Sequence, residues 1–178
     1  MNRRGGWIQT FSGKVYWPID PHEDDVEIID IAHALSMVCR YSGHCSQFYS
    51  VAEHSWHVSY LVPREHALQG LLHDASEAYL ADVARPVKRF LTNYREIEAA
   101  NWRVIARKFG VPEEMHREVH DADTAMLFCE AKQLLGPPPR PWGDEILQAY
   151  VTDREVMCLP PPIGKELFMD RFMELYFK

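Results

Sequence analysis

The chain reads HDASEAYLADVARPVK from residue 73 to residue 88, so a histidine and an aspartate stand side by side and further carboxylates follow. Apolar residues spaced three and four apart precede this stretch, and they predict a helix that opens at Pro63 and runs to about Tyr79. His73 and Glu77 are four residues apart, so they would share one face of that helix. The stretch therefore predicts a helical environment in which polar side chains gather on one side.

Helical patterns continue on both sides of this stretch. Ser50 and Glu53 form the S-x-x-E pattern, in which each side chain satisfies a free backbone N–H at the start of a helix. Near the beginning of the chain, two β-rich runs flank a Ser-Gly dipeptide and predict a small hairpin. We expect the other helices over residues 28–43, 92–109, 112–135, 144–151 and 165–177, with proline-rich connectors at 137–141 and 160–162. These patterns predict an all-α fold with a small N-terminal β-hairpin.

Length and composition narrow the class of protein. The 178 residues fit a single domain, which we expect to cover residues 1–178. Acidic residues outnumber basic ones by 26 to 19, and the resulting charge of -7 disfavours binding to nucleic acid. No apolar run is long enough for a membrane span, and the first residues lack the apolar stretch of a signal peptide. The four cysteines form no C-x-x-C pair, so neither a zinc ribbon nor a disulfide scaffold is indicated, and we expect a cytoplasmic protein.

Four residues on three predicted helices form a candidate metal site. They are His54, His73, Asp74 and Asp123. Two imidazoles and two carboxylates suit a divalent transition metal such as Zn, Co or Mn, and they leave coordination positions open for water or substrate. Each residue alone also has an ordinary structural explanation, because a single histidine on a half-apolar helix is usually a surface or hydrogen-bonded residue.

The order of the motifs strengthens the functional interpretation. The chain carries Ala-Glu-His at residues 52–54, His-Asp-Ala-Ser-Glu at 73–77, D-x-x-x-P-V-K at 82–88 and Ala-Asp at 122–123. In this order they resemble the HD-domain phosphohydrolases, and among these the bacterial 5'-deoxynucleotidases and especially the phage dATP triphosphohydrolases. The resemblance covers roughly residues 25–135. It implies an HD-domain helical bundle, followed by a proline-rich connector and C-terminal helices over 136–178.

The resemblance also assigns roles to single residues. It implies that His54, His73, Asp74 and Asp123 bind the metal, that Glu77 and Asp82 are catalytic, and that Arg40, Tyr41 and Lys88 bind the substrate. Mg at a second site is compatible with these residues. At the position of Tyr41 the family usually has Trp, so a smaller ring is expected to stack on the base.

The activity implied is metal-dependent hydrolysis of a deoxynucleotide. The favoured form is a dATP-preferring triphosphohydrolase, which releases deoxynucleoside and triphosphate by attack of metal-bound water on the α-phosphorus. The alternatives are a 5'-deoxynucleotidase that acts on monophosphates and a metal-containing nucleotide sensor without turnover. The expected partner is a small deoxynucleotide, with no nucleic acid and no membrane. The resemblance also implies a homo-oligomer, either a dimer or a hexamer. The expected location is the cytoplasm of a bacterium or of a phage-infected cell.

Most of the nine histidines are not needed for this site. His57 follows His54 by three residues, and we expect it to have a supporting or surface role. His116 and His120 have the i, i+4 spacing of a metal pair, but no third ligand is evident nearby, so we interpret them as exposed helix residues. His33 is expected to pack in the core, and His66 to lie at the surface.

Overall fold

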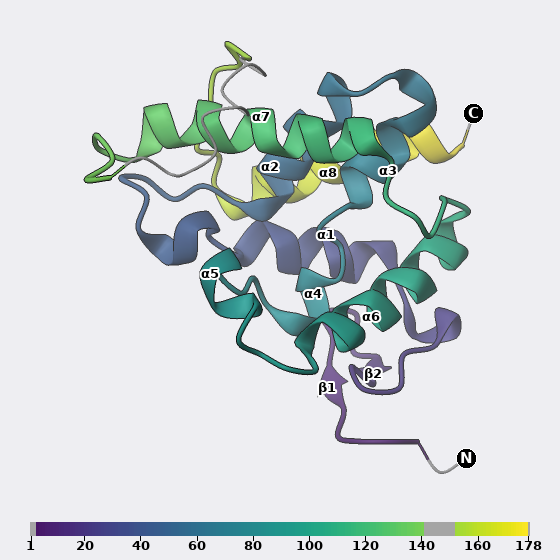
Figure 1. Ribbon diagram of the computed structural model, residues 1–178. Coiled ribbons are helices and arrows are strands. Elements are labelled where there is room, and N and C mark those ends of the chain that lie inside the picture. The colour runs from purple at the N-terminus through teal and green to yellow at the C-terminus, as the bar shows by residue number, and fades with distance from the viewer. Residues whose placement is uncertain (1–2, 141–151, 178) are drawn as a thin grey trace.

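The computed structural model describes residues 3–140 and 152–177, and these residues form an all-α fold with one small antiparallel hairpin (Figure 1). The predicted fold class is therefore confirmed. The helix predicted over residues 144–151 lies outside the described residues. Among the helices that the structure describes, none combines the length and the apolar character that crossing a membrane requires.

The elements follow one another in a simple order. Strands β1 (Ile8–Gln9) and β2 (Val15–Tyr16) pair with Ile8 opposite Tyr16. Short 3-10 turns cover Glu23–Asp25, Arg40–Gly43 and Arg64–His66. The helices are α1 (Ile28–Met37), α2 (Val51–Leu61), α3 (Ala67–Leu72), α4 (Glu77–Leu80), α5 (Arg85–Lys88), α6 (Tyr94–Phe109), α7 (Arg117–Leu134) and α8 (Pro161–Tyr176).

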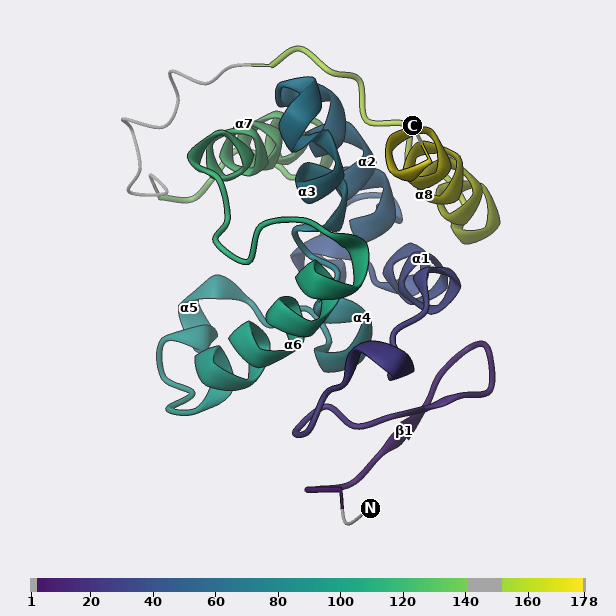
Figure 2. The ribbon, with the colours of Figure 1, turned by 90° about the vertical axis from the view of Figure 1, so that its right-hand side faces the viewer.

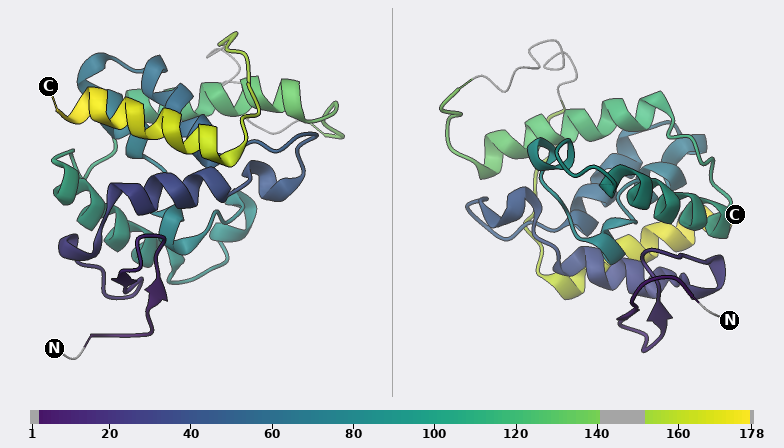
Figure 3. Two further views of the ribbon diagram at one scale, coloured as in Figure 1. Left: turned by 180° about the vertical axis from the view of Figure 1, so that it is seen from behind. Right: turned by 60° about the horizontal axis from the view of Figure 1, so that its bottom comes forward.

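Helix α2 lies at the centre of the fold. It packs against α1, α3, α7 and α8, and Figure 2 shows it between α7 and α8. Figure 3 shows α8 running beside α1 on the back of the molecule. One apolar cluster joins α1, α2, α3, α6 and α8, and a second, which includes Val58 and Met126, fills the space between α2 and α7. Because α2 is covered on several sides, even its polar His54 is fully buried.

The hairpin is anchored to the helices by one aromatic side chain. Tyr16 of β2 is fully buried and stacks on Tyr79 of α4, with 3.6 Å between the ring centroids. Its hydroxyl donates a hydrogen bond to the side chain of Asn101 in α6 at 2.6 Å. The hairpin therefore holds α4 and α6 together below the bundle, and α4 carries Glu77.

The predicted continuous helix from Pro63 to Tyr79 is wrong, because the chain is interrupted at the His73-Asp74 pair. Helix α3 ends at Leu72, and the next backbone bonds run from the N–H of Ala75 to Leu72 and from that of Glu77 to Asp74. These three-residue steps wind the backbone more tightly than an α-helix does. His73 and Glu77 therefore do not share one α-helical face.

Two predicted helix starts are also displaced. The helix expected from Pro112 begins at Arg117, because the Gln69 side chain donates to the carbonyls of Pro112 and Glu114 and accepts from the N–H of His116. These bonds pair the backbone C=O and N–H groups of the connecting segment, which therefore does not need to be helical. The helix expected from residue 165 begins at Pro161, where proline fits the first turn because no backbone N–H is needed there.

The first predicted helix and the predicted break at Pro86 need similar corrections. Helix α1 ends at Met37 rather than near Gly43, since Val38 becomes extended and Cys39 pairs with Ser50 in a β-bridge. Pro86 lies within the first turn of the short helix α5, a position that proline tolerates. Both differences arise from local contacts that the apolar spacing alone does not encode.

Glu53 performs only half of its predicted capping role. Its backbone N–H donates to the Ser50 hydroxyl at 3.1 Å, as the S-x-x-E pattern predicts. Its carboxylate, however, is fully buried and accepts the backbone N–H groups of residues 157–159 at 2.7 to 3.1 Å. This side chain therefore fixes the segment that leads into α8 against the buried helix α2.

We predict that Glu53→Ala lowers the free energy of unfolding by about 2 to 4 kcal/mol, because three N–H donors lose their acceptor at once. Urea denaturation followed by circular dichroism measures the change. Glu155→Ala, an exposed glutamate in the same segment, is the control and should stay within about 0.5 kcal/mol of the wild type. Equal midpoints for the two variants would contradict the proposed anchoring.

Candidate metal centre

Four side chains from three parts of the chain converge on one place. His54 comes from α2, His73 and Asp74 from the turn after α3, and Asp123 from α7. His54 Nε2 lies 3.3 Å from His73 Nε2 and 3.2 Å from an Asp123 oxygen. An Asp74 oxygen lies 3.3 Å from His73 Nε2 and 3.8 Å from His54 Nε2. His54, His73 and Asp74 could together hold a metal ion, and Asp123 faces the same nitrogen atoms.

The hydrogen bond made by Nδ1 of each imidazole determines whether the Nε2 atom of the same ring carries a free lone pair. His73 Nδ1 lies 2.8 Å from the carbonyl oxygen of Gly70, which can only accept, so Nδ1 carries the hydrogen. His54 Nδ1 lies 2.6 Å from a carboxylate oxygen of Glu130 and donates in the same way. In the neutral rings both Nε2 atoms are therefore acceptors that point at each other and at two carboxylates. Such a set of donor atoms fits a divalent cation at its centre.

The distances agree with this interpretation. Ligands held about 2.1 Å from one ion lie about 3.0 to 3.4 Å from each other in octahedral or tetrahedral geometry. The shorter separations in the cluster, 3.2 and 3.3 Å, fall in this range, and the longer ones, 3.8 and 3.9 Å, need only a small closure. The ligand atoms of His54, His73 and Asp74 all lie within 4.8 Å of one another, whereas Asp123 is outside this group, so its carboxylate must move closer to Asp74 for the four residues to share one ion.

In the absence of a metal ion, protonation of the two histidines supplies the positive charge that faces the carboxylates. Burial opposes protonation of His73, but the Asp74 and Asp123 carboxylates outweigh it and raise its pKa to about 9. Burial likewise acts against ionised Asp123, yet the hydrogen bond from His54 and the two imidazole charges hold its pKa at about 2. The pKa of Asp74 is also lowered, by His73, His54 and Arg40 acting against burial. The carboxylates are thus ionised and ready to bind a cation that displaces the proton.

Glu130 is the main functional residue that the sequence patterns missed. Its side chain is fully buried on α7 and accepts hydrogen bonds from His54, Arg40 and Tyr49 at 2.6, 3.0 and 2.8 Å. Burial works against its charge, but Arg40 and these hydrogen bonds hold its pKa at about 2. Glu130 follows Asp123 by seven residues, or two helical turns, and this spacing was the available signal.

The loop after α1 brings Arg40 and Tyr41 beside the centre. Arg40 Nη1 lies 3.6 Å from an Asp74 oxygen, so the guanidinium bridges the candidate metal centre and Glu130. Tyr41 adopts a left-handed backbone with φ of 54°, and its hydroxyl donates to the carbonyl of Leu127 at 2.9 Å. A non-glycine residue in this conformation costs of order 1 to 3 kcal/mol, and such strain clusters at functional sites. The ring of Tyr41 is thereby held at the wall of the cavity.

Glu77, Asp82 and Lys88 also lie around this cavity. Glu77 is 7% exposed, and burial together with the charges of Asp74 and Asp82 raises its pKa to about 9. Lys88 Nζ lies 3.8 Å from Glu77 but 2.7 Å from Glu98 of α6, so a carboxylate already neutralises it. Asp82 follows Ala81, whose φ of 64° redirects the chain after α4 and brings Asp82 to the cavity wall.

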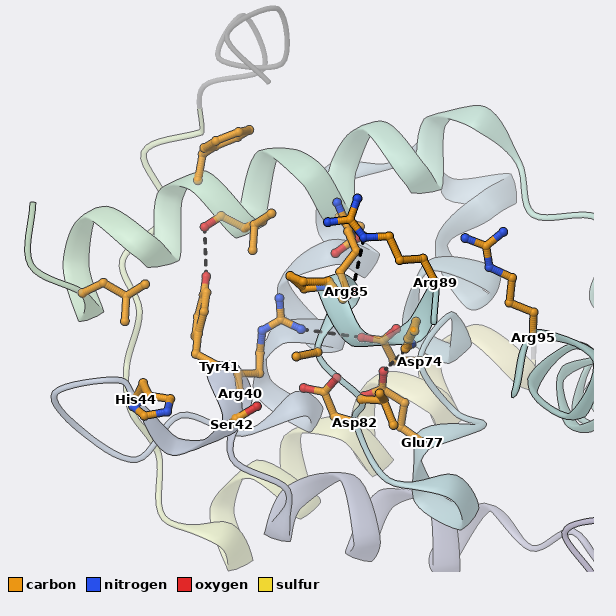
Figure 4. Close-up of a pocket in the computed structure, with 18 residues that line it drawn as sticks. Arg40, Tyr41, Ser42, His44, Asp74, Glu77, Asp82, Arg85, Arg89 and Arg95 are labelled. Carbon is orange, nitrogen blue, oxygen red and sulfur yellow. Dashed lines mark hydrogen bonds and ion pairs between the residues drawn. The ribbon is translucent and has the colours of Figure 1, made fainter. Parts of the chain in front are cut away.

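The centre opens into one large cleft, drawn in Figure 4. Its volume is about 1030 Å³, at the upper end of the range for small-molecule sites. The cleft is lined by the five residues proposed to be catalytic or substrate-binding, namely Arg40, Tyr41, Glu77, Asp82 and Lys88. Asp74 and Asp123 of the candidate centre line it too. Apolar side chains of α7, including Leu127 and Phe128, line part of the wall. Arg85, Arg89 and Arg95, which the sequence interpretation did not include, line it as well.

The remaining histidines have other partners. His57 is buried, 3.8 Å from a Glu53 oxygen and 3.4 Å from the Arg154 side chain, which agrees with a supporting role. His116 does not pair with His120. It caps α7 and stacks on His66 at 3.8 Å between centroids. Glu118 lies with His66 and His116 in a group of possible ligand atoms within 4.8 Å, which does not include His120, and His116 and His120 are both exposed, as expected. His33 stacks on Phe11 in a half-buried position.

Fold and site together define an all-α protein with a partly buried cluster of two histidines and two aspartates that could hold a metal ion. The chain belongs to the same family as YfdR of Escherichia coli (strain K12), a protein described as uncharacterized, to which it is 40% identical over 171 residues and 95% of each chain. It is also 35% identical over 144 residues to the uncharacterized protein RCAP_rcc00048 of Rhodobacter capsulatus, covering 73% of this chain and 74% of the relative. No family model matches the chain.

We predict that Asp123→Asn weakens Mn or Zn binding at least 100-fold, because the amide removes a negative ligand from the centre. Isothermal titration calorimetry with the metal-free protein measures the affinity. Asp121→Asn is the matched control, since Asp121 lies two residues away on α7 and pairs with Arg117 instead. Equal affinities of the two variants would remove Asp123 from the metal centre.

Proposed function

We propose that this protein is an HD-type, metal-dependent phosphohydrolase that acts on deoxynucleotides. The observation that carries the proposal is the convergence of two imidazole nitrogens and two carboxylates at the wall of a cleft that also holds basic side chains. The order of the motifs, which resembles that of the HD-domain enzymes, supports the same class. A purely structural helical protein would have no need for acceptor atoms facing one another in its interior.

The residues of the chain divide the chemical work between them. His54, His73, Asp74 and Asp123 would hold the ion, which when bound supplies Lewis acidity and lowers the pKa of water. Arg40 would neutralise a phosphate oxygen, as its planar guanidinium suits a bidentate contact. Glu77 carries a proton at neutral pH in the metal-free protein and can exchange it with a reacting oxygen. Asp82 would orient a second cation, with Mg as a candidate, or the leaving group.

The favoured substrate is a deoxynucleoside triphosphate, cleaved to deoxynucleoside and triphosphate. Support for a nucleotide comes from the two kinds of wall in the cleft: Tyr41 and the apolar residues of α7 suit a base, and the basic residues suit phosphates. The preference for adenine rests on the resemblance to phage dATP triphosphohydrolases. A 5'-deoxynucleotidase acting on monophosphates is the second candidate, because Arg40 beside Asp74 suffices for one phosphate. Cytoplasmic location and homo-oligomer assembly remain expectations from the sequence.

We predict that the purified protein, loaded in turn with Mn, Co, Zn or Mg, converts dATP to deoxyadenosine and triphosphate, as separated by ion-exchange chromatography. Asp74→Asn should lower the rate at least about 1000-fold, because it weakens the metal site without changing side-chain size. Asp170→Asn, an exposed aspartate of α8, is the control and should keep the wild-type rate.

The same panel separates the alternatives. Release of orthophosphate from deoxynucleoside monophosphates alone would establish the nucleotidase. Nucleotide binding without turnover with any of the four metals would indicate a sensor and contradict the proposed hydrolase. Activity that survives Asp74→Asn would contradict the metal assignment.

A further inference from the structure

A run of basic residues borders the metal centre. Between Asp82 and Glu96 the sequence contains no carboxylate, yet it contains Arg85, Lys88, Arg89 and Arg95. The whole chain carries a charge of -7, with only 19 basic residues. A run of four cations with no carboxylate between them in the sequence is therefore unusual in this protein, and all four line the cleft.

The four cations differ in how far their charge is already neutralised. Lys88 has Glu98 at 2.7 Å. Arg85 has an Asp123 oxygen at 3.7 Å, and its side chain is 69% exposed. Neither Arg89 nor Arg95 makes an ion pair with a residue that the structure describes, and both are exposed. Arg89 and Arg95, rather than the lysine predicted from the sequence, thus have their charge free for an anionic ligand, and the exposed Arg85 is held only by a long contact to Asp123.

Their placement puts this charge along one wall of the cleft. Arg85 and Arg89 are four residues apart at the two ends of the short helix α5, so they project from the same side. Figure 4 shows both reaching toward α7 above Asp74, with Arg95 beyond them. A second cavity of about 360 Å³ shares Arg85 and Arg95 with the first, along with Asp74 and Asp123. The arginines therefore extend from the metal centre toward this second cavity.

Like charges spaced in this way disfavour the folded state unless an anion lies between them. One phosphate at the metal centre needs only the ion and Arg40. Three further guanidinium groups beyond the centre match a ligand with additional phosphates, because guanidinium forms paired, charge-assisted hydrogen bonds to phosphate oxygens.

We propose that Arg85, Arg89 and Arg95 form a subsite for the β- and γ-phosphates of a nucleoside triphosphate, which makes them specificity-determining residues for triphosphate over monophosphate. The proposal rests on the proposed phosphohydrolase function of the same cleft. A nucleoside triphosphate and free tripolyphosphate both carry a linear polyphosphate, and the subsite would recognise this group in either ligand.

The first experiment measures binding alone. Sodium tripolyphosphate and orthophosphate are titrated calorimetrically into the protein in EDTA, because tripolyphosphate chelates divalent ions. The wild type should bind tripolyphosphate at least about tenfold more tightly than orthophosphate, and Arg89→Ala/Arg95→Ala should abolish this difference. Arg103→Ala, on α6 but outside both cavities, is the matched control and should bind as the wild type does. Equal affinities for the two anions in the wild type, or an unchanged difference in the double variant, would overturn the proposal.

The second experiment measures hydrolysis of dATP and dAMP by the metal-loaded proteins. The double variant should raise KM for dATP at least about tenfold, leave kcat within about threefold and leave KM for dAMP unchanged within about twofold. Loss of tripolyphosphate binding without a change in KM for dATP would assign the arginines to free polyphosphate and overturn a role in nucleotide recognition. A wild type that hydrolyses neither nucleotide would contradict the proposed function, and titration with dATP and dAMP in EDTA would then test the subsite by itself.

Discussion

The hydrogen bond between His54 and Glu130 is the contact on which the candidate centre depends. Both side chains are fully buried, and the 2.6 Å contact fixes the hydrogen on Nδ1, so that Nε2 faces His73 and Asp123. Glu130 also binds Arg40 and two tyrosine hydroxyls, so one carboxylate orients a proposed metal ligand and the guanidinium beside it. Such outer carboxylates commonly raise metal affinity 10- to 100-fold.

The fold supplies the rigid frame that this contact requires. Helix α2 is covered by α1, α3, α7 and α8, which explains how polar residues such as His54 and Glu53 are held in the interior. The other proposed ligands come from a tight turn and from α7, so the candidate centre joins elements far apart in the sequence. By contrast, the residues proposed to contact substrate lie on the loops around Arg40 and Asp82, on α5 and at the start of α6. Backbone strain at Tyr41 and Ala81 shapes the two loops at the wall of the cleft.

Local patterns in the sequence predicted the features that depend on local physics. The hairpin, the start of α2 at Ser50 and the end of α6 before Gly110 follow from turn and capping preferences, and the structure confirms them. The convergence of the four proposed ligands was expected from motif order. The interruption at His73 and the late start of α7 depend on packing and on Gln69, which no local spacing encodes. The roles of Glu130 and the three arginines could not be predicted from the sequence, because they depend on how α5, α6 and α7 are arranged around one cleft.

The central claim is that His54, held by Glu130, points its free nitrogen at an ion shared with His73, Asp74 and Asp123. Anomalous diffraction from crystals grown with Mn²⁺ or Zn²⁺ tests it most directly. The account predicts one strong peak about 2.0 to 2.3 Å from both Nε2 atoms and from an oxygen of each aspartate. A peak only beside His66, His116 and Glu118, or no peak between the two Nε2 atoms, would contradict it.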